Sequence, residues 1–337
     1  MTRIILFGPL PPPTGGVSIH VERLNILLSN MGFSVQQCDE SKIIKENVFN
    51  IRSLRILRYL KEAYKADIVH IHSSLHSLRL FHIIISFLLG KKIIITLHSW
   101  RSGKFITWLW KEILNFFCDK IIFVSGEVAE KIHTRTVKRL VFPAFLPPNN
   151  TEAPLNEHII HFISRARKKS KKILVSNAFR IVEHNGVDLY GLDICLDVFS
   201  AHKCYENAVL IYIISDPSVN PDKIKKYKSF IEEKKITSSV LIHCGAIDFC
   251  HLLKLADASI RATNTDGDAI SIRESLYLGV PCIASDCTKR PSGTILFNTR
   301  SSQSLASAIL KIGTTTPVNS EINEDSIHEF YSKLYQG

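Results

Sequence analysis

Residues 258–285 read ASIRATNTDGDAISIRESLYLGVPCIAS. This stretch predicts a strand over Ala258–Ala262, a polar loop, a short helix that stops at Gly279, and a second strand over Pro281–Ser285. Strands that are joined through a helix run parallel to each other. The stretch therefore predicts a parallel sheet that is covered by helices.

The same alternation continues outward over most of the chain. Helices are predicted over Val17–Met31 and over Leu54–Tyr64, where Leu54, Ile56, Leu57 and Leu60 form an apolar stripe. We predict an α/β fold of two Rossmann-like, doubly wound domains, each with its ligand edge at the carboxyl ends of its strands. The remaining predicted strands are Arg3–Phe7, Asp67–His72, Lys92–Leu97, Lys120–Val124, Lys172–Ser176, Val209–Ser215 and Val240–Cys244.

The length and the prolines divide the chain. A chain of 337 residues, of which 45% are hydrophobic, is too long for one compact core. Val141–Asn150 holds three prolines in ten residues and predicts a hinge. We expect an N-terminal domain over 1–146, a C-terminal domain over 147–324, and a helix over 325–337 that packs back on the N-terminal domain.

Cysteine spacing and hydropathy indicate the compartment. The eight cysteines include no CxxC pair and match no zinc template, so we expect reduced thiols. The N-terminus turns directly into a proline loop, unlike a signal peptide. The longest apolar stretch, Leu80–Leu89, is far shorter than the roughly 20 residues that span a bilayer. A cytoplasmic protein is expected.

Positive charge is concentrated in the first half. Residues 1–148 hold 20 lysines and arginines against 10 acidic residues, whereas residues 149–337 hold 22 against 21. A basic domain can bind nucleic acid, an anionic membrane or a phosphorylated small molecule. No RRM, zinc-finger or helix-turn-helix signal accompanies the charge, so nucleic acid is not the expected partner.

Two loops at strand ends could bind an anion or a sugar. Gly15 and Gly16 open a helix after the first strand, where backbone N–H groups favour an anion; the alternative is an ordinary turn. In the 258–285 stretch, Asp266 and Glu274 can accept hydrogen bonds from sugar or ribose hydroxyls. The alternative is that Asp268 caps the helix and Glu274 complements its dipole. Backbone N–H groups that suit a pyrophosphate are expected at Asp268, Ala269, Ile270 and Ser271.

Three histidines lie at strand ends. His70 and His72 share one face of a strand, but no third ligand with suitable spacing is evident, so no metal is expected. His98 follows the strand Lys92–Leu97. A lone histidine at such a position is more often structural than catalytic.

Together, Gly15-Gly16, His98 and the block from Asp266 to Glu274 that ends in LYLGVPCIASD resemble retaining glycosyltransferases of family 4. The resemblance implies the GT-B fold, with a cleft between the domains. It also implies transfer of a sugar from a nucleotide diphosphate-sugar with retained anomeric configuration. Neither a metal nor another cofactor is implied, because the departing phosphate can take the acceptor proton.

The resemblance implies roles for particular residues. Glu274 would hold the ribose, Asp266 the donor sugar, and Arg180 the donor phosphates. His98 would bind a donor-sugar hydroxyl or steady the transition state, and Gly245 would lie near the base, with His72 placed on the acceptor side. Asp266 is shorter than the family's glutamate. The family's lysine after the arginine is missing, because Leu189-Tyr190-Gly191 stands there, so another cation such as Arg273 would have to assist Arg180.

Trp100–Phe117 holds all three tryptophans beside lysines, which is typical of an interfacial membrane helix; a core helix is the alternative. With the basic N-terminal half, we expect membrane contact through Trp100, Lys104, Trp108 and Lys111, at the inner face of the cytoplasmic membrane. The predicted function is transfer of a hexose or N-acetylhexosamine to a lipid-linked saccharide in bacterial surface polysaccharide assembly, such as O-antigen (lipopolysaccharide) or capsule. The alternatives are a GT-B sugar-nucleotide 2-epimerase and a catalytically silent saccharide- or membrane-binding relative.

Overall fold

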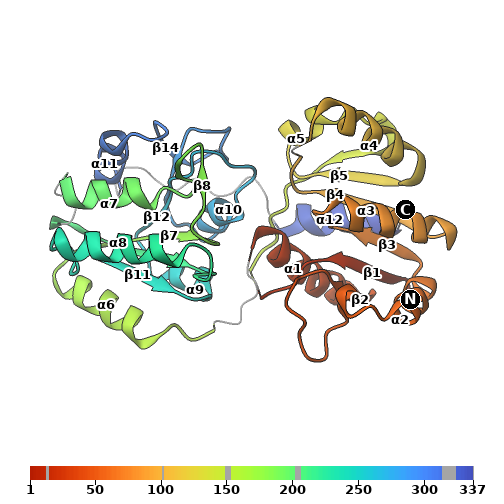
Figure 1. Ribbon diagram of the computed structural model, residues 1–337, viewed down its shortest axis with the longest axis horizontal. Coiled ribbons are helices and arrows are strands. Elements are labelled where there is room, and N and C mark those ends of the chain that lie inside the picture. Colours follow the sequence, from red (N-terminus) through yellow and green to blue (C-terminus); the bar gives the residue numbers. More distant parts are fainter. Residues whose placement is uncertain (13–14, 101, 149–152, 202–205, 313–323, 337) are drawn as a thin grey trace. The chain divides into compact units, whose positions relative to one another are not determined.

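The computed structural model describes residues 1–12, 15–100, 102–148, 153–201, 206–312 and 324–336. The chain forms two compact units (Figure 1). Unit 1 comprises Met1–Leu146 with Glu324–Gly337, and unit 2 comprises Pro147–Asn323. The chain passes from one unit to the other within the proline-rich segment, where a continuous strand or helix cannot form.

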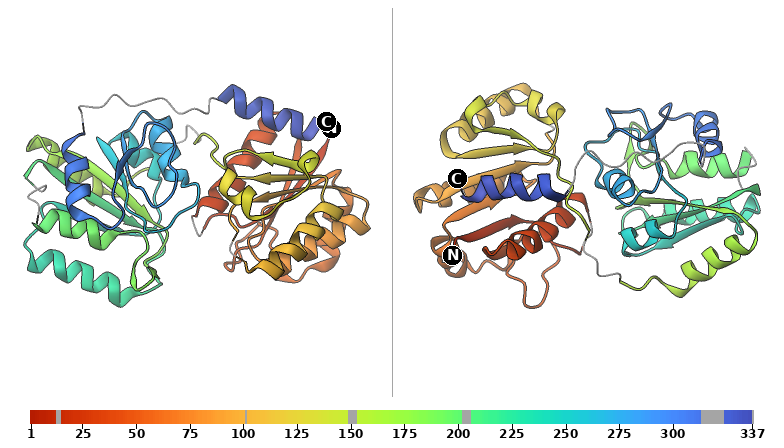
Figure 2. Two further views of the ribbon diagram at one scale, coloured as in Figure 1. Left: turned by 90° about the horizontal axis from the view of Figure 1, so that it is seen from above. Right: turned by 180° about the vertical axis from the view of Figure 1, so that it is seen from behind.

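Unit 1 is built on a parallel sheet with the strand order β2-β1-β3-β4-β5-β6. Helices α2–α5 pack on one face of this sheet, while α1 and α12 lie on the other (Figure 2). The strands are β1 (Arg3–Gly8), β2 (Ser34–Asp39), β3 (Ile68–Ile71), β4 (Lys92–Leu97), β5 (Lys120–Phe123) and β6 (Arg139–Val141). The helices are α1 (Gly16–Asn30), α2 (Ile56–Lys65), α3 (His76–Leu88), α4 (Lys104–Phe117), α5 (Gly126–Lys131) and α12 (Glu324–Gln336).

The C-terminal helix α12 is fixed to unit 1 by aromatic side chains. The Tyr335 hydroxyl lies 2.5 Å from Nδ1 of His70 on β3, and Phe330 stacks on Phe142 with ring centroids 3.9 Å apart. His70 also reaches Thr96 on β4, so this buried histidine ties two strands to the helix. Helix α12 accordingly buries Ile327, Tyr331, Leu334 and Tyr335.

Helix α2 differs from the sequence prediction. Three residues of the predicted apolar stripe, Leu54, Ile56 and Leu57, are exposed, and Leu57 is 85% accessible, whereas Leu60 is partly buried against the core. Leu54 adopts a left-handed conformation at the end of a short 3-10 turn, so α2 starts two residues later than expected. The helix buries Tyr59 and Ala63 instead. The apolar stripe in the sequence therefore does not coincide with the buried face of this helix.

Unit 2 contains a second parallel sheet with the order β11-β10-β7-β12-β13-β14. In chain order this is 3-2-1-4-5-6, the arrangement of dinucleotide-binding Rossmann folds. The predicted fold class is confirmed. The strands are β7 (Lys172–Ala178), β10 (Ala208–Ile214), β11 (Val240–Cys244), β12 (Ala258–Arg261), β13 (Cys282–Ser285) and β14 (Ile295–Phe297), with a small hairpin of β8 (Glu183–His184) and β9 (Val187–Asp188).

Helices cover both faces of the sheet in unit 2. Helices α6 and α9 pack on one face, and α7, α8 and α11 on the other. The helices are α6 (Glu157–Lys168), α7 (Leu192–Ala201), α8 (Pro221–Glu233), α9 (Phe249–Lys254), α10 (Ile270–Tyr277) and α11 (Ser302–Leu310). The sequence did not predict the strands β2, β6 and β14 or the hairpin; these strands are short or carry polar residues, so their hydrophobic signal is weak.

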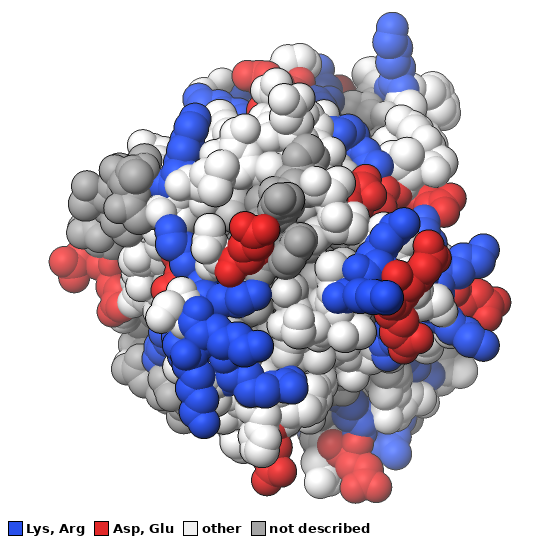
Figure 3. All heavy atoms as spheres, turned by 90° about the vertical axis from the view of Figure 1, so that its left-hand side faces the viewer, with Lys and Arg blue, Asp and Glu red and all other residues white. Residues whose placement is uncertain are grey.

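The two units have different surfaces. Of the large hydrophobic side chains that are exposed in the described residues, 18 lie in unit 1 and three, Ile160, Leu296 and Leu310, lie in unit 2. Positive charge is not confined to unit 1, because Lys and Arg also gather on a face of unit 2 (Figure 3). No helix in the described ranges is long and apolar enough to cross a membrane. The seven described cysteines are free thiols.

Candidate functional site

In doubly wound sheets, ligands bind beyond the carboxyl ends of the strands, at the point where the strand order reverses. In unit 1 this point lies between β1 and β3, and in unit 2 it lies between β7 and β12. Each unit presents a different group of polar side chains there. Unit 1 presents histidines, whereas unit 2 presents arginines and carboxylates.

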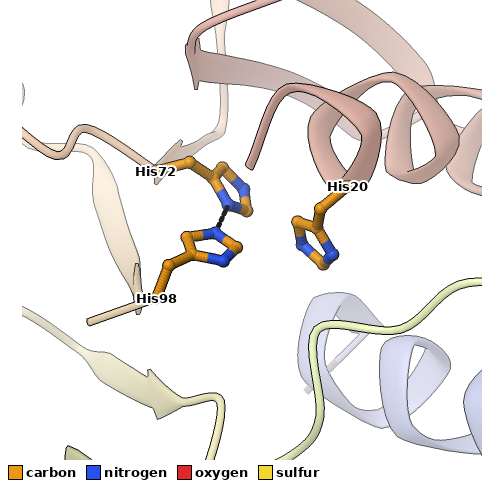
Figure 4. Close-up of side chains that lie close together, drawn as sticks. All are labelled: His20, His72 and His98. Carbon is orange, nitrogen blue, oxygen red and sulfur yellow. Dashed lines mark hydrogen bonds between the residues drawn. The ribbon is translucent and has the colours of Figure 1, made fainter. Parts of the chain in front are cut away.

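Three histidines from separate elements meet in unit 1 (Figure 4). His20 lies on α1, His72 follows β3 and His98 follows β4, and one ring nitrogen of each lies within 4.8 Å of the others. Nδ1 of His72 is 3.2 Å from Nε2 of His98. Gly8 makes room for this histidine cluster, because a Cβ atom there would lie 3.0 Å from Cβ of His72.

The histidines of this cluster are uncharged near neutral pH. Burial lowers the pKa of His20 to about 4, with a further lowering by Arg23, although the hydrogen bond to the Ala144 carbonyl opposes the shift. Burial also holds the pKa values of His72 and His98 well below the usual range. Nδ1 of His20 lies 2.6 Å from the Ala144 carbonyl oxygen and must donate to it. In neutral His20 the lone pair is therefore on Nε2.

The cluster could accept hydroxyl groups or hold a metal. Within the described part of the chain, Nε2 of His20 and Nε2 of His72 are buried without a hydrogen-bond partner. The sequence showed no third ligand beside His72, and the structure supplies His20. His70 is not part of the cluster, because Tyr335 and Thr96 occupy its two nitrogens. Ligand nitrogens in a tetrahedral zinc site lie about 3.4 Å apart, so rings with nitrogens up to 4.8 Å apart would have to move closer to bind zinc.

The loop before α1 is anchored at the predicted glycines. The N–H of Gly15 donates to Oγ of Ser18, and Gly16 begins α1. The buried carboxylate of Asp39 accepts from the N–H of Leu10 and from Lys45. Residues 13 and 14 of the loop lie outside the described residues. The start of α1 is therefore held beside the end of β1, where its N–H groups can face a ligand.

Asp266 in unit 2 lies between two arginines. One of its oxygens lies 3.0 Å from Nε of Arg261 and 3.0 Å from Nη1 of Arg290, and Thr263 donates to the same oxygen at 3.1 Å. Burial alone would raise the pKa of Asp266, but the two guanidinium groups outweigh it and the pKa is lowered. This differs from the expectation that the carboxylate accepts hydrogen bonds from sugar hydroxyls, since arginines already occupy it.

The arginine cluster, defined by Arg261, Asp266 and Arg290, carries one more positive than negative charge. Arg261 also lies over the ring of Tyr190, at 5.1 Å from its centroid. Tyr190 belongs to the segment that stands in place of the family's lysine. A cation from β12 therefore lies beside the segment from which the expected lysine is missing.

Helix α10 begins without a side-chain cap. Its N-cap residue is Ala269, and Asp268 instead accepts a 2.6 Å hydrogen bond from Nε of Arg273. The alternative in which Asp268 caps the helix is therefore wrong. The N–H groups of Ile270 and Ser271 have no hydrogen-bond partner among the described residues. Uncapped N–H groups at a helix start favour an anion.

The other predicted donor residues lie at strand ends or on α10. Arg180 follows β7 and stacks on Phe179, with no hydrogen bond or ion pair to any described residue. Glu274 is buried on α10. Gly245 follows β11 with φ of +133°, and its N–H donates to the Ile214 carbonyl. A conformation of this kind favours glycine and leaves the backbone uncovered by a side chain.

The tryptophans of the predicted membrane segment separate in the structure. Trp108 is 57% accessible, whereas Trp100 is only 5% accessible. The Nε1 group of Trp100 donates to Thr107, and its ring packs on Trp110. Trp100 is therefore an internal residue rather than a surface contact. Lys104 is exposed and Lys111 is partly exposed.

Sequence reasoning did not single out His20, Arg261 and Arg290. His20 lies four residues before Leu24 and eight before Leu28, on the helix face that packs on the sheet, and this spacing was a usable signal. Arg261 is a charged residue within a buried strand, which signals a nearby partner. Nothing in the sequence marks Arg290, because its partners come from β12, β13 and the loops after them.

Comparisons with known proteins agree with this architecture. The model of "Glycosyltransferase Family 4" matches residues 42–141. The chain is 15% identical to Anabaena HepE in complex with UDP-glucose, with a TM-score of 0.69 over 98% of this chain and 95% of that one. A glycosyltransferase from Rickettsia africae gives 14% identity and a TM-score of 0.70 over 99% and 98% of the two chains.

WaaG, a glycosyltransferase involved in lipopolysaccharide biosynthesis, gives 14% identity and a TM-score of 0.64 over the full length of both chains. No curated protein sequence matches the chain. The family match falls within unit 1, together with Gly15-Gly16 and His98, whereas the block from Asp266 to Glu274 lies in unit 2. The chain therefore has the GT-B fold, and its resemblance to family 4 glycosyltransferases is confirmed.

Proposed function

We propose that the protein is a retaining glycosyltransferase. It would move a hexose or N-acetylhexosamine from a nucleotide diphosphate-sugar to a lipid-linked saccharide during bacterial surface polysaccharide assembly, such as O-antigen or capsule. HepE has been crystallised with UDP-glucose, and WaaG is involved in lipopolysaccharide biosynthesis. Both share the fold, which supports a nucleotide-sugar donor and this biological setting.

The donor side of the proposal is carried by one observation: unpartnered positive groups gather at the strand-order reversal of unit 2. Arg180 has no partner in the described chain, and α10 presents two unpaired N–H groups. When the bond from the sugar C1 to the diphosphate oxygen breaks, negative charge develops on the diphosphate. A fixed guanidinium and helix N–H groups stabilise such charge without a metal ion.

The arginine cluster supplies the charge that the missing lysine would have contributed. Asp266 acts as a positioning residue in this proposal, since its carboxylate fixes the guanidinium groups of Arg261 and Arg290. The net positive charge of the cluster adds to that of Arg180. Arg273 contributes less, because Asp268 neutralises it.

The histidine cluster would bind hydroxyl groups. Neutral imidazole nitrogens accept hydrogen bonds, but the low pKa values of His20, His72 and His98 make these residues weak bases. The acceptor proton would therefore pass to the departing phosphate oxygen as the new bond forms between the acceptor oxygen and C1. Attack from the face that the phosphate leaves gives retained configuration.

The proposed location is the inner face of the cytoplasmic membrane, with peripheral attachment through unit 1. Exposed large hydrophobic residues are concentrated in unit 1, and helix α4 carries Phe105 and Trp108 beside Lys104. Aromatic and basic side chains together suit an anionic lipid surface. Lipid-linked saccharides present their diphosphate at that surface.

The proposal is tested by donor binding and product analysis. A thermal-shift screen with UDP-, GDP- and dTDP-sugars should show one donor that raises the melting temperature. With donor alone, an epimerised nucleotide sugar would instead indicate a 2-epimerase. Nucleotide release that stays at background with lipid-linked acceptors would indicate a silent relative.

The variant Glu274→Gln sharpens this test. It should abolish the donor-induced thermal shift and lower turnover about a hundredfold, because the ribose would lose a charged acceptor. The melting temperature without donor should stay close to that of the wild type. Glu232→Gln, on the exposed side of α8, is the matched control. A large loss of stability with retained turnover would show that Glu274 is structural.

A further inference from the structure

Two cavities in unit 1 share Trp100 in their lining. The first has a volume of about 480 Å³ and is lined by Trp108 and three lysines, Lys104, Lys111 and Lys131; we name it the lysine pocket. The second has a volume of about 350 Å³ and is lined by Ser74, His76, Arg79 and Ser99; we name it the Arg79 pocket. Both volumes are in the range of small-molecule sites.

The lysine pocket has the chemistry of a phosphate site. No acidic side chain lines it, and none of its lysines has an ion pair among the described residues. Helix α4 begins at Lys104 with Gly103 as an N-cap that offers no side chain, so no cap side chain competes with an anion for the N–H groups of its first turn. Three uncompensated lysines and a helix start match the charge of a diphosphate.

The rim of the lysine pocket is apolar. Trp108 lines the pocket, and Phe105 and Ile106 are exposed beside it on the same helix α4. An alkyl chain that leaves a diphosphate in the pocket would meet these side chains. An amphipathic ligand therefore fits this surface better than a free phosphate does.

The Arg79 pocket has the chemistry of a sugar site. Ser74 and Ser99 offer hydroxyl groups, and the rings of His76 and Trp100 meet edge to face at 5.1 Å. Arg79 is fixed by two hydrogen bonds to the Ser73 carbonyl oxygen. Two of its lining residues are close in the chain to the histidine cluster, because Ser74 lies two residues after His72 and Ser99 directly follows His98.

From these observations we infer that unit 1 binds a polyprenyl diphosphate-linked saccharide across Trp100. The diphosphate lies in the lysine pocket, the polyprenyl chain lies over Phe105 and Trp108, and the first sugar lies in the Arg79 pocket. This orientation directs the saccharide toward His72 and His98. The inference rests on the proposed lipid-linked acceptor, and it specifies which residues recognise the lipid part.

Vesicle sedimentation tests the inference with three compositions: phosphatidylcholine alone, phosphatidylcholine with phosphatidylglycerol, and phosphatidylcholine with a polyprenyl diphosphate at equal surface charge. The wild type should bind the polyprenyl diphosphate vesicles most tightly. Changing Lys104, Lys111 and Lys131 together to Gln should weaken this binding about a hundredfold, since each lysine contributes about 1 kcal/mol. Soluble pyrophosphate should compete only weakly, because it lacks the alkyl chain.

The matched control removes three exposed lysines from α8, as Lys225→Gln, Lys226→Gln and Lys228→Gln. This helix has no exposed large hydrophobic residue, so the control should bind like the wild type. Equal losses in the two triple variants, or equal wild-type binding to both anionic vesicles, would overturn the inference in favour of diffuse charge attraction. Full competition by pyrophosphate would also overturn it, by showing a free-phosphate site.

Two further measurements separate this inference from the proposed function. The pocket triple variant should keep the thermal shift that a nucleotide sugar produces, because its lysines lie in unit 1. A protein that binds no nucleotide sugar but prefers polyprenyl diphosphate vesicles would refute the proposed function alone. Trp108→Ala removes an exposed side chain and should weaken binding to both anionic vesicles without unfolding the protein. Unchanged binding would show that the exposed aromatic side chains of α4 do not contact the polyprenyl chain.

Discussion

The two units hold their candidate site residues by opposite electrostatic means. In unit 1, His20 and His72 are buried, His98 is partly buried, all three are uncharged, and two of their nitrogens lack partners in the described structure. In unit 2, Arg261, Asp266 and Arg290 are charged and paired with one another. A neutral nitrogen cluster suits hydroxyl groups, while a fixed positive cluster suits a diphosphate. Under the proposed function, unit 1 would therefore bind hydroxyl groups and unit 2 would bind the donor diphosphate.

The largest expected effect tests whether the arginine cluster is held by its charges. Arg261→Met should lower the free energy of unfolding of unit 2 by about 3 kcal/mol, because it removes one partner of a mostly buried ion pair. Chemical denaturation of the full chain, followed by hydrogen exchange in unit 2, measures this loss. The less buried pair between Arg300 and Asp193 is the matched control, and Arg300→Met should cost no more than about 1 kcal/mol.

The difference between the two losses tests whether burial strengthens the ion pairs of the arginine cluster. Equal losses for Arg261→Met and Arg300→Met would show that burial adds nothing to the cluster, and the contrast with unit 1 would fail. A larger loss for Arg261→Met would support Asp266 as the group that fixes the donor-side cations.

The next variant is expected to lower turnover without lowering the stability of the protein. Arg180→Ala should lower turnover of the nucleotide sugar about a hundredfold, or about 2.7 kcal/mol in the activation barrier, because a guanidinium aimed at developing charge is lost. Stability should barely change, since Arg180 pairs with no described residue. Steady-state kinetics and thermal unfolding give the two readouts.

Arg165→Ala is a suitable control for Arg180→Ala, because Arg165 also lies over a phenylalanine ring but belongs to α6. Its turnover should equal that of the wild type. Full turnover in Arg180→Ala would remove this residue from the donor site and leave the arginine cluster alone to stabilise the diphosphate.

Acidification should lower the stability of unit 1 more than that of unit 2. The pKa of His20 is about 4 in the folded chain and near its ordinary value of 6.5 when unfolded, so between these pH values the unfolded chain binds more protons. Unit 1 should therefore lose about 2 kcal/mol for His20 alone between pH 7 and pH 5. The pKa of Asp266 is lowered, so its contribution to unit 2 persists at pH 5 and is lost only in stronger acid.

All three tryptophans lie in unit 1, so their fluorescence reports the unfolding of that unit. Urea unfolding at pH 7 and pH 5 should show a clear shift by fluorescence and a smaller one by hydrogen exchange in unit 2. His20→Asn keeps a donor for the Ala144 carbonyl but does not titrate, and it should reduce the pH dependence. A pH dependence equal to that of the wild type would contradict the role given to His20.

How much the sequence could predict also differs between regions. Most strands of both sheets were predictable, because runs such as Lys92–Leu97 are apolar and β-branched and are buried by helices on both faces. The short strand β6 and the polar strand β2 gave too little hydrophobic signal. The histidine and arginine clusters could not be predicted as groups, because they depend on which strands are neighbours. Strand order brings His72 and His98 together, although they are 26 residues apart.

The smallest expected effect concerns the exposed apolar residues of α2. It tests the difference between the surfaces of the two units. Leu57→Gln should change the free energy of unfolding by less than about 0.5 kcal/mol, since the side chain is already in solvent. Tyr59→Ala is the contrasting variant on the same helix, and it should cost about 3 kcal/mol because it empties a fully buried position. If Leu57→Gln were as costly as Tyr59→Ala, Leu57 would be a core residue, contrary to its exposure in the structure. A negligible cost would instead place α2 among the exposed apolar surfaces that distinguish unit 1 from unit 2.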